Sequence, residues 1–440
     1  MTTYKKTLYL CEKPSQARDV GAVLGIKRRG DGFMELNNGD VISWAVGHLL
    51  ELADPEKQNP DWGGRWHWGQ LPMIPDTWKY EVVSRTKPQF NIIKGLLKTV
   101  DRVVIATDAG REGELIAREI LEYCKWRGHI ERLWTSSLVA SDIKAALGKL
   151  RSNADTYPIY EAAVARSHCD NFYGYSGSRG ATLAAAVRGD FFPLGRVQTP
   201  TLAMVVRRDL EIKNFNQREY FELEAQVRTK SGKSFKMMHA PDAENRITTK
   251  EEAERRKRQA GRAQGPLKVE KNNGSEGAPL AYSLPALQKD ANRIFGFTAK
   301  NTLKLAQALY EKKAATYPRT DCQHLAASQM LEVEDVLRVV ERRYGSVVEA
   351  LKRCGVVKRK STFDDTKLTD HHGIIPTGQY VELEGAELQL YQLICQRYLQ
   401  LLGPDCKFQT TRVTMDANGI PFKATGKIIL DPGWTALKVI

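Results

Sequence analysis

The sequence predicts a multidomain protein that combines α/β and α+β architecture. The chain has 440 residues, which is too long for one hydrophobic core and implies several domains. Its first 150 or so residues alternate strand-like and helical segments, whereas later strand-rich segments flank a helical block. Apolar residues make up 42% and charged residues 27% of the chain, as in ordinary globular proteins. No apolar run is long enough to cross a bilayer.

The N-terminal region predicts an α/β domain. Residues 7–10 (Thr-Leu-Tyr-Leu) are an apolar strand, followed by a helix that starts near Pro14 and stops before Gly25. Proline is common at the first position of a helix and glycine just past its last residue, so these two residues mark the ends of the predicted helix. Residues 102–106 form a second buried strand, which leads through a polar turn into an amphipathic helix. This pattern places acidic groups at the carboxyl ends of the strands of a domain spanning 1–152.

The remaining segments divide by their hydrophobic periodicity. Helical patterns dominate from 153 to 216, and strand patterns, including Tyr220–Ala225, return from 217 to 281 around a charged surface helix at Glu251–Arg262. Two helices, the second capped by Thr298, open the segment 282–378. A further helix and strands fill 379–440. Strands before and after a helical block predict one β domain, 217–281 and 379–440, interrupted by an inserted helical domain.

Net charge and cysteine spacing indicate what kind of partner this protein binds and in which cellular compartment it works. The formal net charge of +14 favours a polyanionic partner. The first six residues lead straight into a strand without a signal-peptide pattern, which predicts a cytoplasmic protein. The seven cysteines are scattered, and none shows Cys-x-x-Cys spacing. Neither a disulfide framework nor a zinc ribbon is therefore indicated.

The run Thr316-Tyr317-Pro318-Arg319-Thr320-Asp321 carries candidate chemistry. Pro318 pushes Tyr317 out of helical space, so its ring should project from an extended turn. Arg319 can lie on the same side of an extended backbone. A phenol beside a guanidinium suits attack on a phosphodiester, with the cation stabilising the charge that develops on the phosphate. Taken alone, these residues fit a surface tyrosine in a proline turn better.

Acidic residues follow two of the predicted strands. Glu12 and Lys13 follow the first strand, and Asp108 and Glu112 follow the later one. Three carboxylates that converge at strand ends can hold a hard cation, which prefers oxygen ligands. The alternative is a set of solvated turn acids.

The order and spacing of these motifs resemble the type IA DNA topoisomerases, and the topoisomerase III branch in particular. The matching segments extend over nearly the whole chain. They are 12–15 (Glu-Lys-Pro-Ser), 44–49 (Trp-Ala-Val-Gly-His-Leu), 106–114, 195–202 (Gly-Arg-Val-Gln-Thr-Pro-Thr-Leu), 286–288, 316–321 and 370–377 (Asp-His-His-Gly-Ile-Ile-Pro-Thr).

The resemblance implies a fold and an activity. The fold would be an N-terminal toprim domain, a first part of a helical DNA-gripping domain at 153–216, a β-rich arch and a helical domain carrying the tyrosine, together an incomplete type IA toroid. The activity would be ATP-independent cleavage of one DNA strand through a transient 5′-phosphotyrosine at Tyr317, passage of another strand and religation. Relaxation of negative supercoils and decatenation would follow.

The resemblance also assigns roles to single residues. Tyr317 would be the nucleophile, Arg319 and Lys13 would contact the scissile phosphate, and Glu12 would serve the leaving 3′-hydroxyl as acid or base. His371 would assist catalysis near the tyrosine. The alternative is that His371 has only a structural role. Magnesium would be held by Glu12, Asp108 and Glu112. Single-stranded DNA would be bound by Arg166, Asp170, Tyr175, Arg196 and Gln198. The alternative is that these residues are ordinary polar groups on a helix surface with no role in DNA binding.

Two departures from the family pattern stand out. Gly110 occupies the place of the middle acid of the metal cluster, so magnesium affinity should fall and a Gly110→Asp change should restore it. The chain also stops at Ile440 without the segment that completes the family's ring, so the ring should be unclosed.

Three functions remain open at this stage: an active topoisomerase, a catalytically impaired single-strand-DNA-binding relative or fragment, and a toprim primase or nuclease. The last gives no role to Tyr317. We expect a monomer in the bacterial cytoplasm, associated with the nucleoid or a plasmid, with a helicase or single-strand-binding protein as partner.

Overall fold

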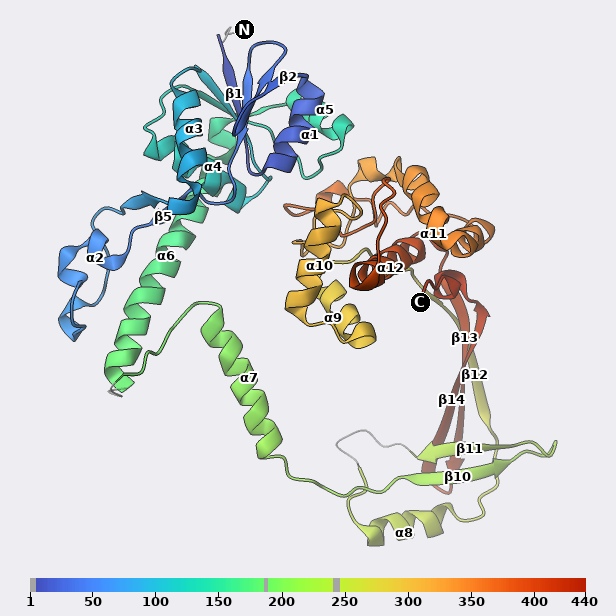
Figure 1. The fold of residues 1–440 in the computed structure, drawn as a ribbon. Helices are drawn as coiled ribbons and strands as arrows, with labels where there is room; N and C mark the ends of the chain where they lie inside the picture. Colours follow the sequence, from blue (N-terminus) through green and yellow to red (C-terminus); the bar gives the residue numbers. More distant parts are fainter. Residues whose placement is uncertain (1–4, 186–188, 240–245) are drawn as a thin grey trace.

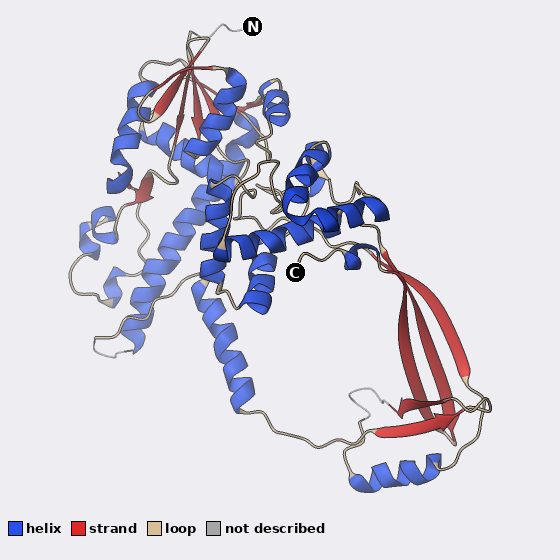
Figure 2. Ribbon diagram, turned by 45° about the vertical axis from the view of Figure 1, so that its right-hand side comes forward, coloured by secondary structure: helices blue, strands red, loops and turns tan. Residues whose placement is uncertain are grey.

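The chain folds into a series of domains arranged as an arc (Figure 1). The structure is a computed structural model, and it describes residues 5–185, 189–239 and 246–440. The N-terminal sheet domain leads into long helices, which lead to a β-rich arch; a three-stranded ribbon then returns to a helical domain that lies beside the N-terminal domain (Figures 1 and 2). Residues far apart in sequence therefore meet where the first and last domains touch.

The N-terminal domain is built on a seven-stranded sheet with the order β2-β3-β4-β1-β7-β8-β9. The central strand β1 pairs in parallel with β4 and β7, and β7 pairs in parallel with β8, whereas β2, β3 and β9 join antiparallel. The strands are β1 Thr7–Cys11, β2 Ile26–Arg29, β3 Phe33–Leu36, β4 Val41–Trp44, β7 Arg102–Ala106, β8 His129–Arg132 and β9 Arg151–Ser152. A small separate pair is formed by β5 Leu50–Leu52 and β6 Tyr80–Val82.

Helices cover both faces of this sheet. One apolar cluster joins the sheet to α3 (Lys87–Leu97) and α4 (Arg111–Tyr123), and the other joins it to α1 (Pro14–Leu24) and α5 (Ala140–Leu147). Because both faces are covered, β1 and β7 read as continuous apolar runs, and all five residues of β1 are buried. The carboxyl ends of β1 and β7 are neighbours, so the residues that follow them meet at one edge of the sheet.

A helical section connects this domain to the arch. The 33-residue helix α6 (Asn153–Ala185) packs against α4 and is followed by α7 (Gln198–Lys213), along which no residue is buried. The short α2 (Pro55–Gln58) belongs to the same region of Figure 1.

The β-rich arch contains a five-stranded antiparallel sheet with the order β10-β11-β14-β13-β12. Its strands are β10 Leu223–Arg228, β11 Ser234–His239, β12 Lys268–Glu276, β13 Cys406–Ala417 and β14 Ile420–Asp431. The surface helix α8 (Lys250–Ala260) lies below the sheet in Figure 1. The segments before and after the helical domain thus share one sheet, as the sequence predicted.

The last domain is helical and has its own large core. Its helices are α9 Leu284–Phe295, α10 Ala299–Glu311, α11 Val333–Cys354 and α12 Gly385–Leu401. Thr298 caps α10, because its hydroxyl accepts a hydrogen bond from Asn301 N. The helix α11 was not among the predicted elements, and its backbone is non-helical at Tyr344.

One predicted boundary is wrong. The strand expected at Tyr220–Ala225 begins at Leu223, and Phe221 instead forms an isolated bridge with Ile247. No helix in the described part of the chain is long and apolar enough to span a membrane.

Candidate active site

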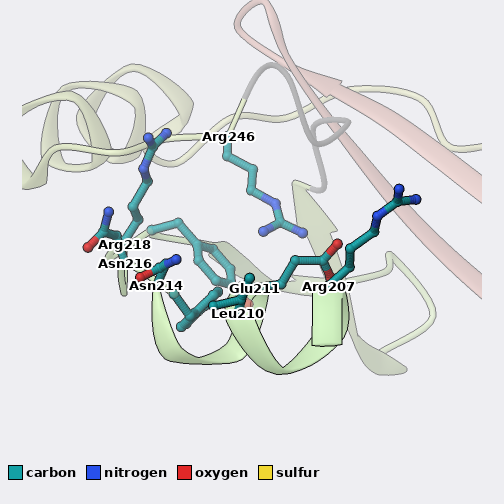
Figure 3. A pocket seen from close by; sticks show the side chains of 9 residues that line it. Arg207, Leu210, Glu211, Asn214, Asn216, Arg218 and Arg246 are labelled. Atoms are coloured by element: carbon teal, nitrogen blue, oxygen red, sulfur yellow. The ribbon is translucent and has the colours of Figure 1, made fainter. Parts of the chain in front are cut away.

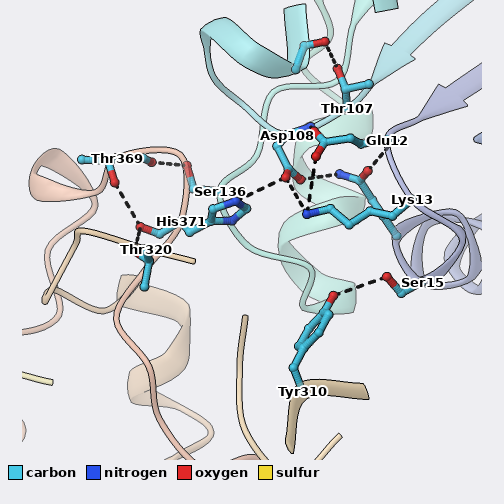
Figure 4. A network of polar contacts seen from close by, with 12 residues as sticks. Glu12, Lys13, Ser15, Thr107, Asp108, Ser136, Tyr310, Thr320, Thr369 and His371 are labelled. Carbon is cyan, nitrogen blue, oxygen red and sulfur yellow. Dashed lines mark hydrogen bonds and ion pairs between the residues drawn. The ribbon is translucent and has the colours of Figure 1, made fainter. Parts of the chain in front are cut away.

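Three predicted site residues meet at the adjoining ends of β1 and β7 (Figure 4). Lys13 Nζ lies 2.8 Å from Asp108 Oδ2 and 3.6 Å from Glu12 Oε1. Asp108 N donates to Glu12 Oε2 at 3.3 Å. Gln16, on the first turn of α1, donates to Asp108 Oδ1 at 3.1 Å. The sequence placed these ends together correctly, but it did not assign a role to Gln16.

Contacts with the core of the N-terminal domain fix the backbone of the loop that follows β7. A Cβ on Gly113 would lie 2.1 Å from the carbonyl oxygen of Asp108, so only glycine fits there. Thr107 Oγ1 donates to Gly113 O at 2.8 Å, and Arg132 Nη2 donates to Asp108 O at 2.6 Å. Arg132 is fully buried and is paired with the buried Glu114. The Asp108 backbone is therefore fixed by the core of the domain.

The helical domain brings Tyr317 onto this cluster. Lys13 Nζ lies 3.9 Å from the centroid of the Tyr317 ring. The rings of His371 and Tyr310 pack against it, with centroid distances of 4.5 and 5.3 Å. Tyr310 also bonds across the domain boundary, with its hydroxyl 3.3 Å from Ser15 Oγ (Figure 4). The phenol is thus enclosed by residues of two domains that are 300 residues apart in sequence.

His371 reaches the same carboxylate as Lys13. Its Nε2 lies 3.2 Å from Asp108 Oδ2. Burial works against ionisation of Asp108, but the hydrogen bond from His371 and the charge of Lys13 hold the pKa of Asp108 well below its usual value. The result is a carboxylate that stays ionised between two nitrogen donors.

The other titratable groups of the cluster shift in opposite directions. Burial, with the charge of Asp108 next, raises the pKa of Glu12. Burial alone would lower the pKa of Lys13, but the charges of Asp108 and Glu12 raise it. Burial also raises the pKa of Tyr317, whereas the charges of Lys13 and Arg319 oppose that rise. Glu12 is therefore suited to hold a proton, and Lys13 stays charged.

Arg319 is exposed and makes no hydrogen bond or ion pair with the residues that the structure describes. Its charge lowers the pKa of Tyr317, which places it within electrostatic reach of the phenol. Cys322, five residues after Tyr317, is a buried free thiol. It contacts the carbonyl of Lys367 and is accounted for by packing.

The predicted metal set does not assemble. Glu112 turns away from Asp108 to pair with His48, whose Nε2 lies 2.6 Å from Glu112 Oε1 and whose Nδ1 lies 3.4 Å from Glu119 Oε2. Hydrogen bonds that His48 donates to Glu112 and then to Glu119 raise the pKa of His48 to about 10. Lys13 Nζ already lies between Glu12 and Asp108, where it pairs with both carboxyl groups.

Across the described ranges, no group of three or more His, Cys, Asp or Glu side chains is placed to hold a metal ion. In this arrangement the three carboxylates do not fit a magnesium ion. The prediction that Glu12, Asp108 and Glu112 form one ligand group is therefore not supported by the geometry.

The predicted DNA-gripping residues lie together on α6 (Arg166, Asp170 and Tyr175), in the loop before α7 (Arg196) and at the first residue of α7 (Gln198). Arg196 forms a two-pronged ion pair with Asp170 at 2.5 and 3.0 Å, and Arg166 lies 3.8 Å from Asp170. Asp170, Tyr175 and Gln198 line one open pocket of about 520 Å³.

Aromatic residues that were not singled out in the sequence complete this pocket. Trp66 and Phe191 pack edge to face at 6.0 Å, and the buried Arg179 lies 4.9 Å from the Trp66 ring. Two aromatic side chains separated by 125 positions give no local sequence signal, so the pattern could not show them. The pocket combines flat rings with polar groups and suits an unstacked nucleobase.

A second pocket of about 880 Å³ lies where α7 meets the arch (Figure 3). Arg207, Arg218 and Arg246 line it, and the Arg246 guanidinium lies 4.6 Å from the Tyr220 ring. None of the predicted site residues contributes to it.

Comparison with known proteins agrees with this geometry. A family model described as DNA topoisomerase matches residues 155–439, and a Toprim domain model matches residues 7–138. The DNA topoisomerase 3 of Bacillus subtilis (strain 168) is 37% identical over 98% of this chain and 59% of that protein. The DNA topoisomerase 3 of Vibrio cholerae is 33% identical over 98% of this chain and 70% of that protein.

The fold is also that of a solved relative. The full-length topoisomerase I of Thermotoga maritima superposes with a TM-score of 0.64 at 20% identity, covering 98% of this chain and 67% of that one. The chain spans about 59% of the length of the Bacillus relatives it matches. A primase or nuclease is disfavoured, because the topoisomerase match covers the Tyr317 segment. The chain belongs to the type IA DNA topoisomerases, within the topoisomerase III branch.

Proposed function

We propose that this chain breaks one strand of DNA by forming a transient 5′-phosphotyrosine at Tyr317, passes another strand and reseals the break. Relaxation of negative supercoils and decatenation would be the outcome. The observation that carries the proposal is the position of the Tyr317 ring, with Lys13 Nζ 3.9 Å from its centroid and His371 packed against it. A surface tyrosine in a proline turn would have neither neighbour.

The proposed cleavage step uses side chains of both domains. The Tyr317 oxygen attacks the phosphorus, a Tyr–O–P bond forms and the P–O3′ bond breaks. With its Nε2–H hydrogen-bonded to the Asp108 carboxylate, His371 has its Nδ1 available to take the phenolic proton. Glu12, whose pKa burial raises, gives its proton to the leaving 3′-oxygen and takes it back on resealing.

Cations would offset the charge that gathers on the phosphate. Lys13 is held at the phenol by Asp108 and Glu12, and the exposed Arg319 is free to fork onto phosphate oxygens. Dependence on magnesium stays a prediction from the family resemblance, and no step of this mechanism passes through the ion.

Single-stranded DNA is the proposed substrate. The pocket of Asp170, Tyr175 and Gln198 is lined by aromatic rings that can receive a flipped or unstacked base. The net charge of +14 would attract the backbone. We also propose, as the sequence led us to expect, a monomer that acts on nucleoid or plasmid DNA in the cytoplasm beside a helicase or single-strand-binding protein. The impaired, non-catalytic alternative is not favoured, because Tyr317, Lys13 and His371 are assembled.

The test is capture of the covalent adduct. The 440-residue chain is incubated with a labelled single-stranded oligonucleotide and quenched with denaturant, and a retarded band is expected. Tyr317→Phe should abolish the band, whereas Tyr310→Phe, which keeps the neighbouring ring and loses a hydroxyl, should retain it. Equal adduct yield in Tyr317→Phe would contradict the assignment.

A further inference from the structure

A hollow of about 340 Å³ lies in the N-terminal domain, between the end of α3, the residues just before β7 and the end of α4. We call it the α3–α4 hollow. The active-site loop follows β7, whereas Val100 and Asp101 of the hollow precede it. The five-residue strand, about 17 Å long, therefore separates the two places. A ligand in the hollow would leave the Tyr317 cluster free.

The floor of the α3–α4 hollow is apolar. Leu97 belongs to the core of the domain, and the half-buried Val100, Cys124 and Trp126 pack against that core. The Trp126 ring lies against the backbone of Gly128, where a Cβ would come within 2.2 Å of its Cζ2 atom. These side chains leave apolar surface at the bottom of a concave site, which favours an apolar group of a ligand.

Four exposed cations line the α3–α4 hollow: Lys94, Lys98, Lys125 and Arg127. Within the described parts of the chain, none of their side chains has a hydrogen-bond or ion-pair partner. The carboxylate at the hollow, Asp101, accepts hydrogen bonds from the backbone N–H groups of Lys5 and Lys6 at 2.9 and 3.0 Å. Four positive charges against one negative charge favour an anionic ligand.

The helix ends at the α3–α4 hollow favour one class of anion. The last carbonyl groups of a helix have no partner within the helix, and the helix dipole places partial negative charge there. Such oxygens can accept hydrogen bonds from the N–H groups of a peptide, whereas the sugar-phosphate backbone of DNA has no N–H to donate. Trp126 supplies one ring, and successive bases of a DNA strand stack on several. An acidic peptide therefore fits better than a DNA strand.

We propose that the α3–α4 hollow is a docking site for an acidic peptide segment of a partner protein. An apolar side chain of the peptide enters the hollow, and its carboxylates pair with the four cations. The volume of about 340 Å³ is at the small end for ligand pockets and suits one large side chain, such as phenylalanine. The charge pairs at the rim steer association and add specificity. The proposal does not rest on strand cleavage, because no residue of the Tyr317 cluster lines the hollow.

The test uses the 440-residue chain and a labelled peptide in which aspartates flank one phenylalanine, with affinity measured by fluorescence anisotropy. Replacing the phenylalanine by alanine should weaken binding about tenfold, because burial of the ring is lost. The double variant Lys98→Glu/Arg127→Glu should also bind the peptide about tenfold more weakly. Lys144→Glu/Lys149→Glu makes the same change of charge at exposed positions of the same domain and should bind as the unmodified chain does.

Thiol alkylation locates the bound peptide. Cys124 lines the α3–α4 hollow, and the exposed Cys354 at the end of α11 lies outside it. Saturating peptide should slow alkylation of Cys124, measured by mass spectrometry, and leave that of Cys354 unchanged.

Three results would overturn the proposal: no binding of the peptide, equal losses of affinity in the two charge variants, or unchanged alkylation of Cys124 at saturation. Two others would identify a different occupant and overturn it as well. Protection of Cys124 by a single-stranded oligonucleotide and not by the peptide would point to DNA. Protection that grows with protein concentration alone would point to a second copy of this chain.

Discussion

Replacing Lys13 by glutamine should separate the stability and the catalysis of the site. Lys13 bridges Asp108 at 2.8 Å and Glu12 at 3.6 Å, and all three side chains are less than one-fifth exposed. Removal of one partner from a buried ion pair leaves a charge without compensation and costs about 3 kcal/mol. For a domain of this size that corresponds to a fall in Tm of about 6–12 °C.

The same change should slow covalent cleavage about 10²–10³-fold, the usual cost of losing one donor to a developing oxyanion. The assay is single-turnover adduct formation, measured beside thermal unfolding. Lys144→Gln is the matched control, because Lys144 is exposed on α5. The double variant Lys13→Gln/Asp108→Asn should regain stability, since the orphaned carboxylate is removed, but not cleavage. Unfolding of Lys13→Gln within experimental error of the unmodified chain, or a loss of stability that the double variant does not recover, would refute this reasoning.

Three further outcomes are expected. Arg132→Met should destabilise the N-terminal domain by about 3–5 kcal/mol in denaturant unfolding, because it leaves the fully buried Glu114 short of a partner; a loss below 1 kcal/mol would contradict this. Neighbouring carboxylates raise the pKa of His48 from its ordinary 6.5 to about 10, so the stability difference between the unmodified chain and His48→Gln should be fully present below pH 6.5 and be lost as the pH rises from there through 10; a difference that grows with pH would have the wrong sign. Tyr175→Ala should weaken single-strand binding about tenfold by loss of base stacking, whereas Tyr123→Ala, at the end of α4 and outside the pocket that Tyr175 lines, should not.

The sequence could predict the part of the site that depends on neighbouring parallel strands. Glu12, Lys13 and Asp108 follow β1 and β7, and a parallel pair delivers such residues to the same edge. Glu112 could not be placed in this way, because it lies one helical turn beyond Asp108. At that point its direction depends on His48, which enters from another loop. The segment 44–49, which contains His48, carries no sequence signal for this pairing.

The hydrophobic pattern and the motifs of the sequence could not predict contacts between domains. Asp370 meets Gly110 across 260 positions, and that contact depends on how two folded domains pack. The helix α11 was missed for a local reason: it is rich in valine, which favours strands, and it is interrupted at Tyr344 next to Gly345. The shared sheet of the arch, in contrast, followed from strand patterns on either side of the helical block.

The most direct test of the central claim is the identity and polarity of the covalent bond. A single-stranded oligonucleotide labelled at either end is cleaved and quenched, and the adduct is digested and mapped by mass spectrometry. We predict that the protein retains the 3′-labelled fragment, that the released 5′-labelled fragment ends in a 3′-hydroxyl, and that the nucleotide is found on the peptide containing Tyr317. Retention of the 5′-labelled fragment, or a nucleotide on Tyr310 or any other residue, would contradict the account.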